Sequence, residues 1–155
     1  PGNTQIKQAL YSIDGSYDWA FEYNHSDGDW EYYFATFDMG PLQNIYGTNC
    51  YVIKATKNDS LEFTGPSEVS DIEKNFTTNH GRWNYIGWVN EDTSLKDALK
   101  SIDGEYDWVF RYNRSTGSWD FYYAPFDTGP LRNFHPCECY VIKAESNITF
   151  NYTKQ

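Results

Sequence analysis

The sequence predicts an α+β fold of two tandem repeats, each with a short helix packed on a small, mostly antiparallel β-sheet with an aromatic hairpin. Residues 6–13 and 95–102 have apolar side chains at helical spacing, which predicts one helix in each half. Residues 17–24 and 106–113 alternate aromatic with other side chains, as strands do. A Gly-containing turn then leads each strand into a second aromatic strand, which indicates a β-hairpin.

The two halves are copies of one another. Residues 9–55 align with residues 98–144 without a gap, and 29 of these 47 positions are identical. Such self-similarity indicates an internal duplication. Beyond residue 144 we match residues 61–63 with 148–150, which assumes that the second copy has lost two residues.

The duplication divides the chain into a first repeat at 1–63, a linker at 64–80 and a second repeat at 81–155. Residues 82–89 (RWNYIGWV) predict a strand before the second helix, and Asp92, Thr93 or Ser94 is the expected cap of that helix. Pro1 aligns with Asn90, so the first repeat is expected to lack its N-terminal strand. An incomplete sheet invites pairing with another chain, although a shortened chain or a linker that fills the gap are the alternatives.

The aromatic stripes are expected to lie in the core. Tyr17, Trp19, Phe21 and Tyr23 recur as Tyr106, Trp108, Phe110 and Tyr112. Aromatic side chains on one face of a strand usually face a helix, so we expect the apolar helix stripe to pack on them. A platform on which sugars stack is the alternative interpretation.

The composition excludes several classes of protein. The chain has 22 acidic and 12 basic residues, a formal net charge of −10, and no basic run, so nucleic acid is not an expected partner. No stretch of 18 apolar residues occurs, so no membrane span is expected. The aromatic content of 19% excludes a disordered chain.

No catalytic residue and no cofactor are predicted. The three histidines, His25, His80 and His135, lie in expected turns or loops, and no nucleophile, phosphate-loop or metalloprotease motif occurs. Residues 135–139 (HPCEC) offer one imidazole and two thiols, but zinc usually requires a second pair of ligands. The acidic turns match no twelve-residue calcium loop. We therefore predict neither an enzyme nor a metal site.

The second repeat resembles a known family of repeats in cell-surface proteins of archaea, especially methanogens. The resemblance is carried by GRWNYIGW at 81–88, TSLKDALKSIDG at 93–104 and the aromatic hairpin that follows. Arg82 interrupts the Gly-Trp-Asn opening of that family, and its Gly-rich loop before the last strands is replaced here by segments that contain cysteine. The resemblance implies an extracellular, envelope-associated protein and supplies no catalytic residues.

The glycosylation sequons favour the same location independently of the family. Asn-x-Ser/Thr occurs at six positions, which are Asn24, Asn58, Asn75, Asn113, Asn147 and Asn151. Such sequons are acceptors of N-linked glycans in exported proteins. Asn24 and Asn113 flank hairpin turns, so the alternative is that Asn serves there only as a turn former.

Three cysteines leave one unpaired after any single disulfide. Cys50 and Cys139 occupy the same position in the two copies, and Cys137 is extra. A bond between Cys137 and Cys139 would be strained, because two residues apart on a strand point the same way. We expect Cys50 to pair with one of them, or all three to pair between chains.

These observations predict a structural protein that assembles with itself outside the cell. We expect a glycosylated, disulfide-linked homopolymer in an archaeal envelope, as a sheath, surface layer (S-layer) or filament subunit. Strand addition at the incomplete first repeat is the expected contact. A surface adhesion module that binds glycans through exposed aromatic side chains is the alternative.

Overall fold

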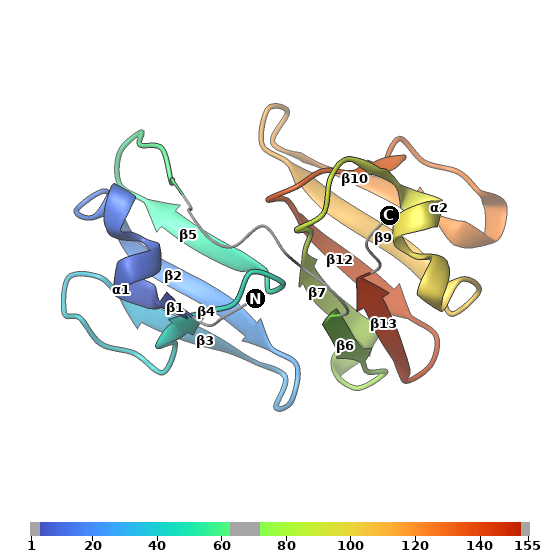
Figure 1. The fold of residues 1–155 in the computed structure, drawn as a ribbon, viewed down its shortest axis with the longest axis horizontal. Helices are drawn as coiled ribbons and strands as arrows, with labels where there is room; N and C mark the ends of the chain where they lie inside the picture. Colours follow the sequence, from blue (N-terminus) through green and yellow to red (C-terminus); the bar gives the residue numbers. More distant parts are fainter. Residues whose placement is uncertain (1–3, 63–71, 153–155) are drawn as a thin grey trace. The chain divides into compact units, whose positions relative to one another are not determined.

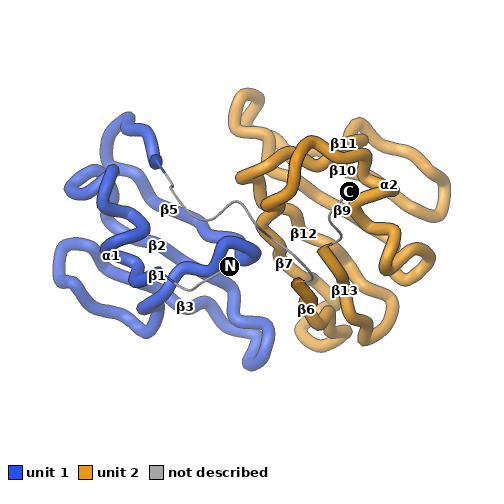
Figure 2. The backbone as a smooth tube through the Cα atoms, viewed as in Figure 1, with its two compact units in different colours: residues 1–68 blue, residues 69–155 orange. Residues whose placement is uncertain are grey.

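The computed structural model describes residues 4–62 and 72–152, which belong to two compact units, 1–68 and 69–155 (Figure 2). In unit 1, a three-stranded antiparallel sheet has the order β3-β2-β5, and β1 pairs with β4 (Figure 1). The elements of unit 1 are β1 (Thr4–Gln5), α1 (Ile6–Ala9), η1 (Tyr11–Ile13), β2 (Tyr17–Asn24), β3 (Asp29–Phe34), β4 (Asn44–Ile45) and β5 (Tyr51–Ala55).

Unit 2 repeats this arrangement and adds two features. Its main sheet has four strands in the order β10-β9-β12-β7, β8 pairs with β11, and a separate ribbon pairs β6 with β13. Its elements are β6 (Ile72–Phe76), η2 (His80–Arg82), β7 (Trp83–Gly87), β8 (Thr93–Ser94), α2 (Leu95–Ala98), η3 (Lys100–Ile102), β9 (Tyr106–Asn113), β10 (Ser118–Tyr123), η4 (Ala124–Phe126), β11 (Asn133–Phe134), β12 (Cys139–Ala144) and β13 (Ile148–Tyr152).

The fold is mostly β, so the predicted α+β class is wrong. Strands make up 46% of the described residues and helical residues 14%, and these residues form 13 strands and two short α-helices. Each predicted helix contains one α-turn of four residues, followed by a 3₁₀ turn. Segments this short gain too few backbone hydrogen bonds to form stable helices by themselves.

The apolar periodicity nevertheless identified buried side chains correctly. Ile6, Ala9, Leu10 and Ile13 are all buried, although the segment is not one continuous helix. An α-turn followed by a 3₁₀ turn keeps side chains three or four residues apart on one side. In the second copy Ser94 is the cap, because its hydroxyl accepts a hydrogen bond from the Asp97 amide.

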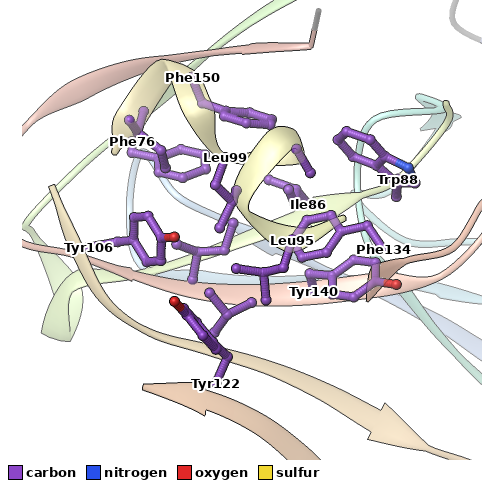
Figure 3. Close-up of a cluster of buried hydrophobic side chains, with 14 of the residues drawn as sticks. Phe76, Ile86, Trp88, Leu95, Leu99, Tyr106, Tyr122, Phe134, Tyr140 and Phe150 are labelled. Atoms are coloured by element: carbon purple, nitrogen blue, oxygen red, sulfur yellow. The ribbon is translucent and has the colours of Figure 1, made fainter. Parts of the chain in front are cut away.

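The two predicted hairpins and the repeated CYVIKA strands are present. β2 pairs antiparallel with β3 and with β5, and β9 pairs likewise with β10 and β12. The sequence analysis placed residues 72–76 in the linker, but they form β6, and Phe76 is buried in the core of unit 2 (Figure 3).

The spacing of 89 residues persists beyond residue 144, so the proposed two-residue deletion is wrong. The Ser12 hydroxyl accepts a hydrogen bond from the Glu62 amide at 2.9 Å. The Ser101 hydroxyl accepts the equivalent bond from the Asn151 amide at 3.1 Å. Glu62 and Asn151 are therefore equivalent residues.

The loops after β3 and β10 share an aspartate and a glycine with unusual backbone angles. Asp127 is left-handed (φ 48°) and accepts hydrogen bonds from the Tyr122 hydroxyl at 3.1 Å and Lys96 Nζ at 2.8 Å. These donors, Lys96 first, lower the pKa of Asp127 to about 2. Gly129 (φ 127°) passes so close to β10 that a Cβ atom there would lie 2.2 Å from the Phe121 carbonyl oxygen.

We expect Gly129→Ala to destabilise unit 2 by at least about 3 kcal/mol, because both the backbone angle and the contact with backbone oppose a side chain. Gly104→Ala is the matched control, because Gly104 also has a positive φ but a Cβ there meets nothing within 4 Å. The control should cost about 1 kcal/mol. Urea unfolding measures the free energy of unfolding of both variants. Equal losses of stability would contradict the close approach of Gly129 to β10.

Candidate functional site: two exposed aromatic faces

Each main sheet carries six aromatic side chains in three cross-strand pairs. In unit 1 the pairs are Trp19 with Phe34, Phe21 with Tyr32, and Tyr23 with Trp30. In unit 2 they are Trp108 with Tyr123, Phe110 with Phe121, and Tyr112 with Trp119. We call these two sets the first and second aromatic faces. Each set lies on one side of its hairpin because alternate residues of a strand point the same way.

The aromatic faces point away from the core, so the expectation that the stripes are buried is wrong for all their members except Tyr17 and Tyr106. The core of unit 1 takes Tyr17, Ala20 and Tyr33 from the hairpin, together with the side chains of α1 and η1. A β-bulge between Tyr17 and Trp19 explains the difference. The extra residue turns Tyr17 towards the core and leaves Trp19 on the opposite face.

The same division occurs in unit 2. Tyr106, Val109 and Tyr122 face the buried cluster formed with α2, η3 and the β6–β13 ribbon (Figure 3). Burial raises the pKa of the Tyr106 and Tyr152 hydroxyls above their ordinary value, which fits their position inside this cluster. The covering elements therefore pack on one face of the sheet, and the second aromatic face is the other.

Two ring contacts have nearly the same geometry on the two faces, whereas the pairs at the other end differ, because Trp19 and Phe34 are tilted at 46° and Trp108 and Tyr123 are stacked at 26°. Trp19 stacks on Phe21 with ring centroids 5.4 Å apart, and Trp108 stacks on Phe110 at 5.5 Å. At the turn end, Tyr23 meets Trp30 edge to face at 5.4 Å, as Tyr112 meets Trp119 at 5.4 Å. These are the offset and T-shaped arrangements that aromatic pairs prefer, so each face is an ordered surface.

Both faces are open to solvent. Trp30 is 45% exposed and Trp119 is 55% exposed, and Tyr32, Tyr112 and Phe121 are also exposed. Contiguous exposed apolar surface of this kind marks a site of interaction. The sequence analysis did not predict this exposed surface, because it assumed a regular strand without a bulge. The signal available in the sequence was the small side chains Ala20 and Val109, which alternate with the aromatic residues and indicate that the other face packs closely.

Charges beside the aromatic faces are paired locally. Lys54 lies opposite Trp19 and contacts Asp18 at 3.2 Å. Lys143 lies opposite Trp108, contacts Asp107 at 3.2 Å and has its Nζ 5.7 Å from the Trp83 ring centroid. The six side chains of each face carry no charge, and the lysines opposite Trp19 and Trp108 are each paired with an aspartate.

A fourth strand distinguishes the two sheets. β5 and β12 have nearly the same sequence, but β12 is paired with β7 on its outer side, and β5 has no such partner among residues 4–62 and 72–152. Val141 opposes Tyr85 of β7 and is 8% exposed, whereas the equivalent Val52 is 53% exposed. The outer edge of β5 therefore offers unpaired backbone and apolar surface.

The cysteines divide as the sequence analysis considered. Cys50 and Cys139 are disulfide-bonded. Cys137 is free and exposed, in a left-handed backbone conformation (φ 62°). Cys139 therefore supplies no thiolate, and His135 Nδ1 instead lies 3.0 Å from an oxygen of Asp92. Within the described ranges, no group of three or more His, Cys, Asp or Glu residues is placed to hold a metal ion.

The sequons differ in exposure. Asn58, Asn75 and Asn147 are exposed, and Asn24, Asn113 and Asn151 are half-buried. Thr153, which completes the last sequon, lies outside the described residues. Among the described residues, no helix is long and apolar enough to cross a membrane.

Comparison with known proteins gives no relative. The chain matches no family model, no curated protein and no solved structure. The aromatic faces, the β5 edge and the free thiol therefore stand as the candidate sites on their own geometry.

Two tryptophans of unit 2 provide a test of which face is buried. Trp88 is 2% exposed, so Trp88→Ala should destabilise the unit by about 3–5 kcal/mol. Trp119→Ala should cost only about 1 kcal/mol, because the ring mainly contacts its cross-strand neighbours. Urea unfolding of both variants measures this, and a loss for Trp119→Ala as large as that for Trp88→Ala would place the aromatic face in the core.

Proposed function

We propose that this protein is an extracellular structural subunit that associates with further copies of itself through its two aromatic faces. The exposed ladder of three cross-strand aromatic pairs on each unit is the observation that carries this proposal. Burial of a single aromatic side chain contributes about 1.5–3 kcal/mol of favourable free energy. Contact between two such faces therefore removes much of the free-energy cost of exposing their aromatic surface to water.

A second copy is the partner that fits best. Each face consists of three cross-strand aromatic pairs at equivalent registers, with Phe and Tyr exchanged at two of the six positions, and apolar surfaces have no charge pattern that must be matched by a different protein. A chain with two like faces can join two neighbours. Such contacts propagate into a chain or layer unless geometry closes them into a ring.

The charge of the protein restricts where copies can touch. The formal net charge of −10 makes most of the surface repel another copy. The aromatic faces have only locally paired charges beside them, so they are where two copies meet at the lowest electrostatic cost. Added salt screens the remaining repulsion.

Three features support a location in an archaeal cell envelope, as part of a sheath, surface layer or filament. One is the resemblance of residues 81–104 to repeats of archaeal surface proteins. Another is the presence of a disulfide, which persists in oxidising surroundings. The third is the set of six sequons.

Two further contacts would reinforce the assembly. The open edge of β5 can add a strand of a neighbouring chain to the sheet. Cys137 can form a disulfide with the same residue of a neighbour, when the two thiols lose two electrons and two protons to an oxidant outside the cell.

Lysine substitutions on the faces should limit the size of the assembly in steps. Tyr32→Lys or Phe121→Lys places a charge in the middle pair of one face, so either variant should stop at dimers. The double variant should be monomeric, with association weakened at least about tenfold for each buried ring lost. Sedimentation velocity under reducing conditions measures the sizes.

Tyr11→Lys is the control, because Tyr11 is highly exposed but lies on η1, outside the aromatic face. It should assemble like the unaltered protein. Assemblies of unchanged size in the double variant would remove the aromatic faces from the proposal.

Cys137→Ser should abolish covalent links between chains without changing the fold, because the side chain is exposed and makes no disulfide. We expect the unaltered protein to migrate as a dimer on gels without reductant, and the variant as a monomer. Identical migration of the two proteins would show that the thiol does not join chains.

Glycan binding is the second candidate, since Trp30 and Trp119 present half-exposed rings on which a sugar could stack. It predicts a monomer under oxidising conditions whose tryptophan fluorescence changes when polysaccharide is added. A protein that assembles without any polysaccharide favours the structural role.

A further inference from the structure

The β6–β13 ribbon of unit 2 has one apolar and one polar face. Phe76, Phe150 and Tyr152 are buried in the core of the unit. On the opposite face, Asn75 lies across from Thr149, and Glu73 lies across from Asn151. The polar face therefore points away from the core, while the second aromatic face lies on the far side of the same core.

One exposed sequon asparagine, Asn75, lies on this ribbon and another, Asn147, directly precedes β13, and both use only their carbonyl oxygens. Asn75 Oδ1 accepts a hydrogen bond from the Thr149 hydroxyl at 2.9 Å. Asn147 Oδ1 accepts from the amide of Thr78 at 2.7 Å and from its hydroxyl at 3.1 Å. Within the described residues, neither Nδ2 donates a hydrogen bond, and both residues are exposed. The amide nitrogens are therefore open to substitution.

Asn58 in unit 1 is similar. It is exposed, it follows β5 in a loop, and its side chain makes no hydrogen bond within the part of the chain that the structure describes. Asn58 and Asn147 are equivalent residues, 89 positions apart, so the duplication has kept an exposed sequon at this place in both units.

The hairpin sequons at Asn24 and Asn113 are different, because both the Oδ1 and the Nδ2 atom of each side-chain amide make hydrogen bonds. Asn24 Nδ2 donates to Glu31 at 2.8 Å, and Asn113 Nδ2 donates to Asp120 at 3.1 Å. Each Oδ1 also accepts both the amide and the hydroxyl of the serine that completes the sequon. This is the geometry of an Asx turn, so these asparagines shape the hairpins.

We propose that Asn58, Asn75 and Asn147 carry N-linked glycans and that Asn24 and Asn113 do not. The inference rests on the extracellular location in the proposed function. The Nδ2 atom forms a bond to the anomeric carbon of an oligosaccharide carried on a polyprenyl phosphate or pyrophosphate. The bond from that carbon to the phosphate oxygen breaks, the phosphate leaves with the electron pair, and the Nδ2 atom loses one proton.

Glycans at these positions leave the aromatic face of unit 2 open. Asn75 projects from the polar side of the ribbon, and the six aromatic side chains project from the opposite side of the main sheet. At Asn24 or Asn113, by contrast, a sugar would replace one N–H of a half-buried amide beside a carboxylate. Glycosylation and self-association therefore use different surfaces of the unit.

Glycopeptide mass spectrometry of the protein from its native cells tests the assignment. We expect sugar masses on the peptides that contain Asn58, Asn75 and Asn147, and unmodified peptides for Asn24 and Asn113. A bare peptide at any of the first three positions, or any glycan on Asn24 or Asn113, overturns the assignment.

Matched variants made in the same cells give a second readout. Asn75→Gln and Asn147→Gln should each reduce the mass on a denaturing gel by one glycan, whereas Asn24→Gln should leave it unchanged. Sedimentation of the same samples separates the two proposals. Unglycosylated protein that still assembles overturns only the glycan assignment, and glycosylated protein that stays monomeric overturns only the assembly.

Discussion

Among the residues that the structure describes, each unit has covering elements for only one face of its main sheet, and most of its properties follow from this. One α-turn, one 3₁₀ turn and short paired strands supply the layer that packs on the hairpin in unit 1, and the β6–β13 ribbon enlarges that layer in unit 2. A strand presents alternate side chains to two faces, so an apolar set that is not covered must meet solvent or another molecule. Six aromatic side chains per unit are in that position.

The division of side chains between the faces depends on the bulge at the start of β2 and β9. The bulge allows Tyr17 and Ala20, three residues apart, to share the core side, and Tyr106 and Val109 repeat this. Small residues at the centre of the inner face let the short helical turns approach closely. The large rings are thereby placed on the outer face, where neighbouring rings stabilise one another by stacked and T-shaped contacts.

Nearly identical strands can have different surroundings in the two copies. β12 is covered by β7, and its valine is buried, whereas β5 leaves the equivalent valine half-exposed. The described chain contains one strand of the β7 type and two strands able to accept it. Unit 1 is therefore the less complete unit, and its open edge and its aromatic face are adjoining surfaces suited to contact with another chain.

The sequons also differ in their surroundings although they share one sequence pattern. The asparagine of the pattern shapes a turn at Asn24 and is exposed to solvent at Asn75.

The sequence by itself determined the duplication, the hairpins with their turns, the CYVIKA strands and the buried positions of the short helical segments. These depend on local periodicity and turn chemistry, which neighbouring residues specify. Only the tertiary structure decided that the segments at 6–13 and 95–102 are single turns, that residues 72–76 belong to unit 2, and that the aromatic stripe faces outwards. A period of two shows that Trp19, Phe21 and Tyr23 share a face, but the inner face is chosen by the bulge and by what packs against it. Those contacts join residues far apart in the chain, so no local pattern contains them.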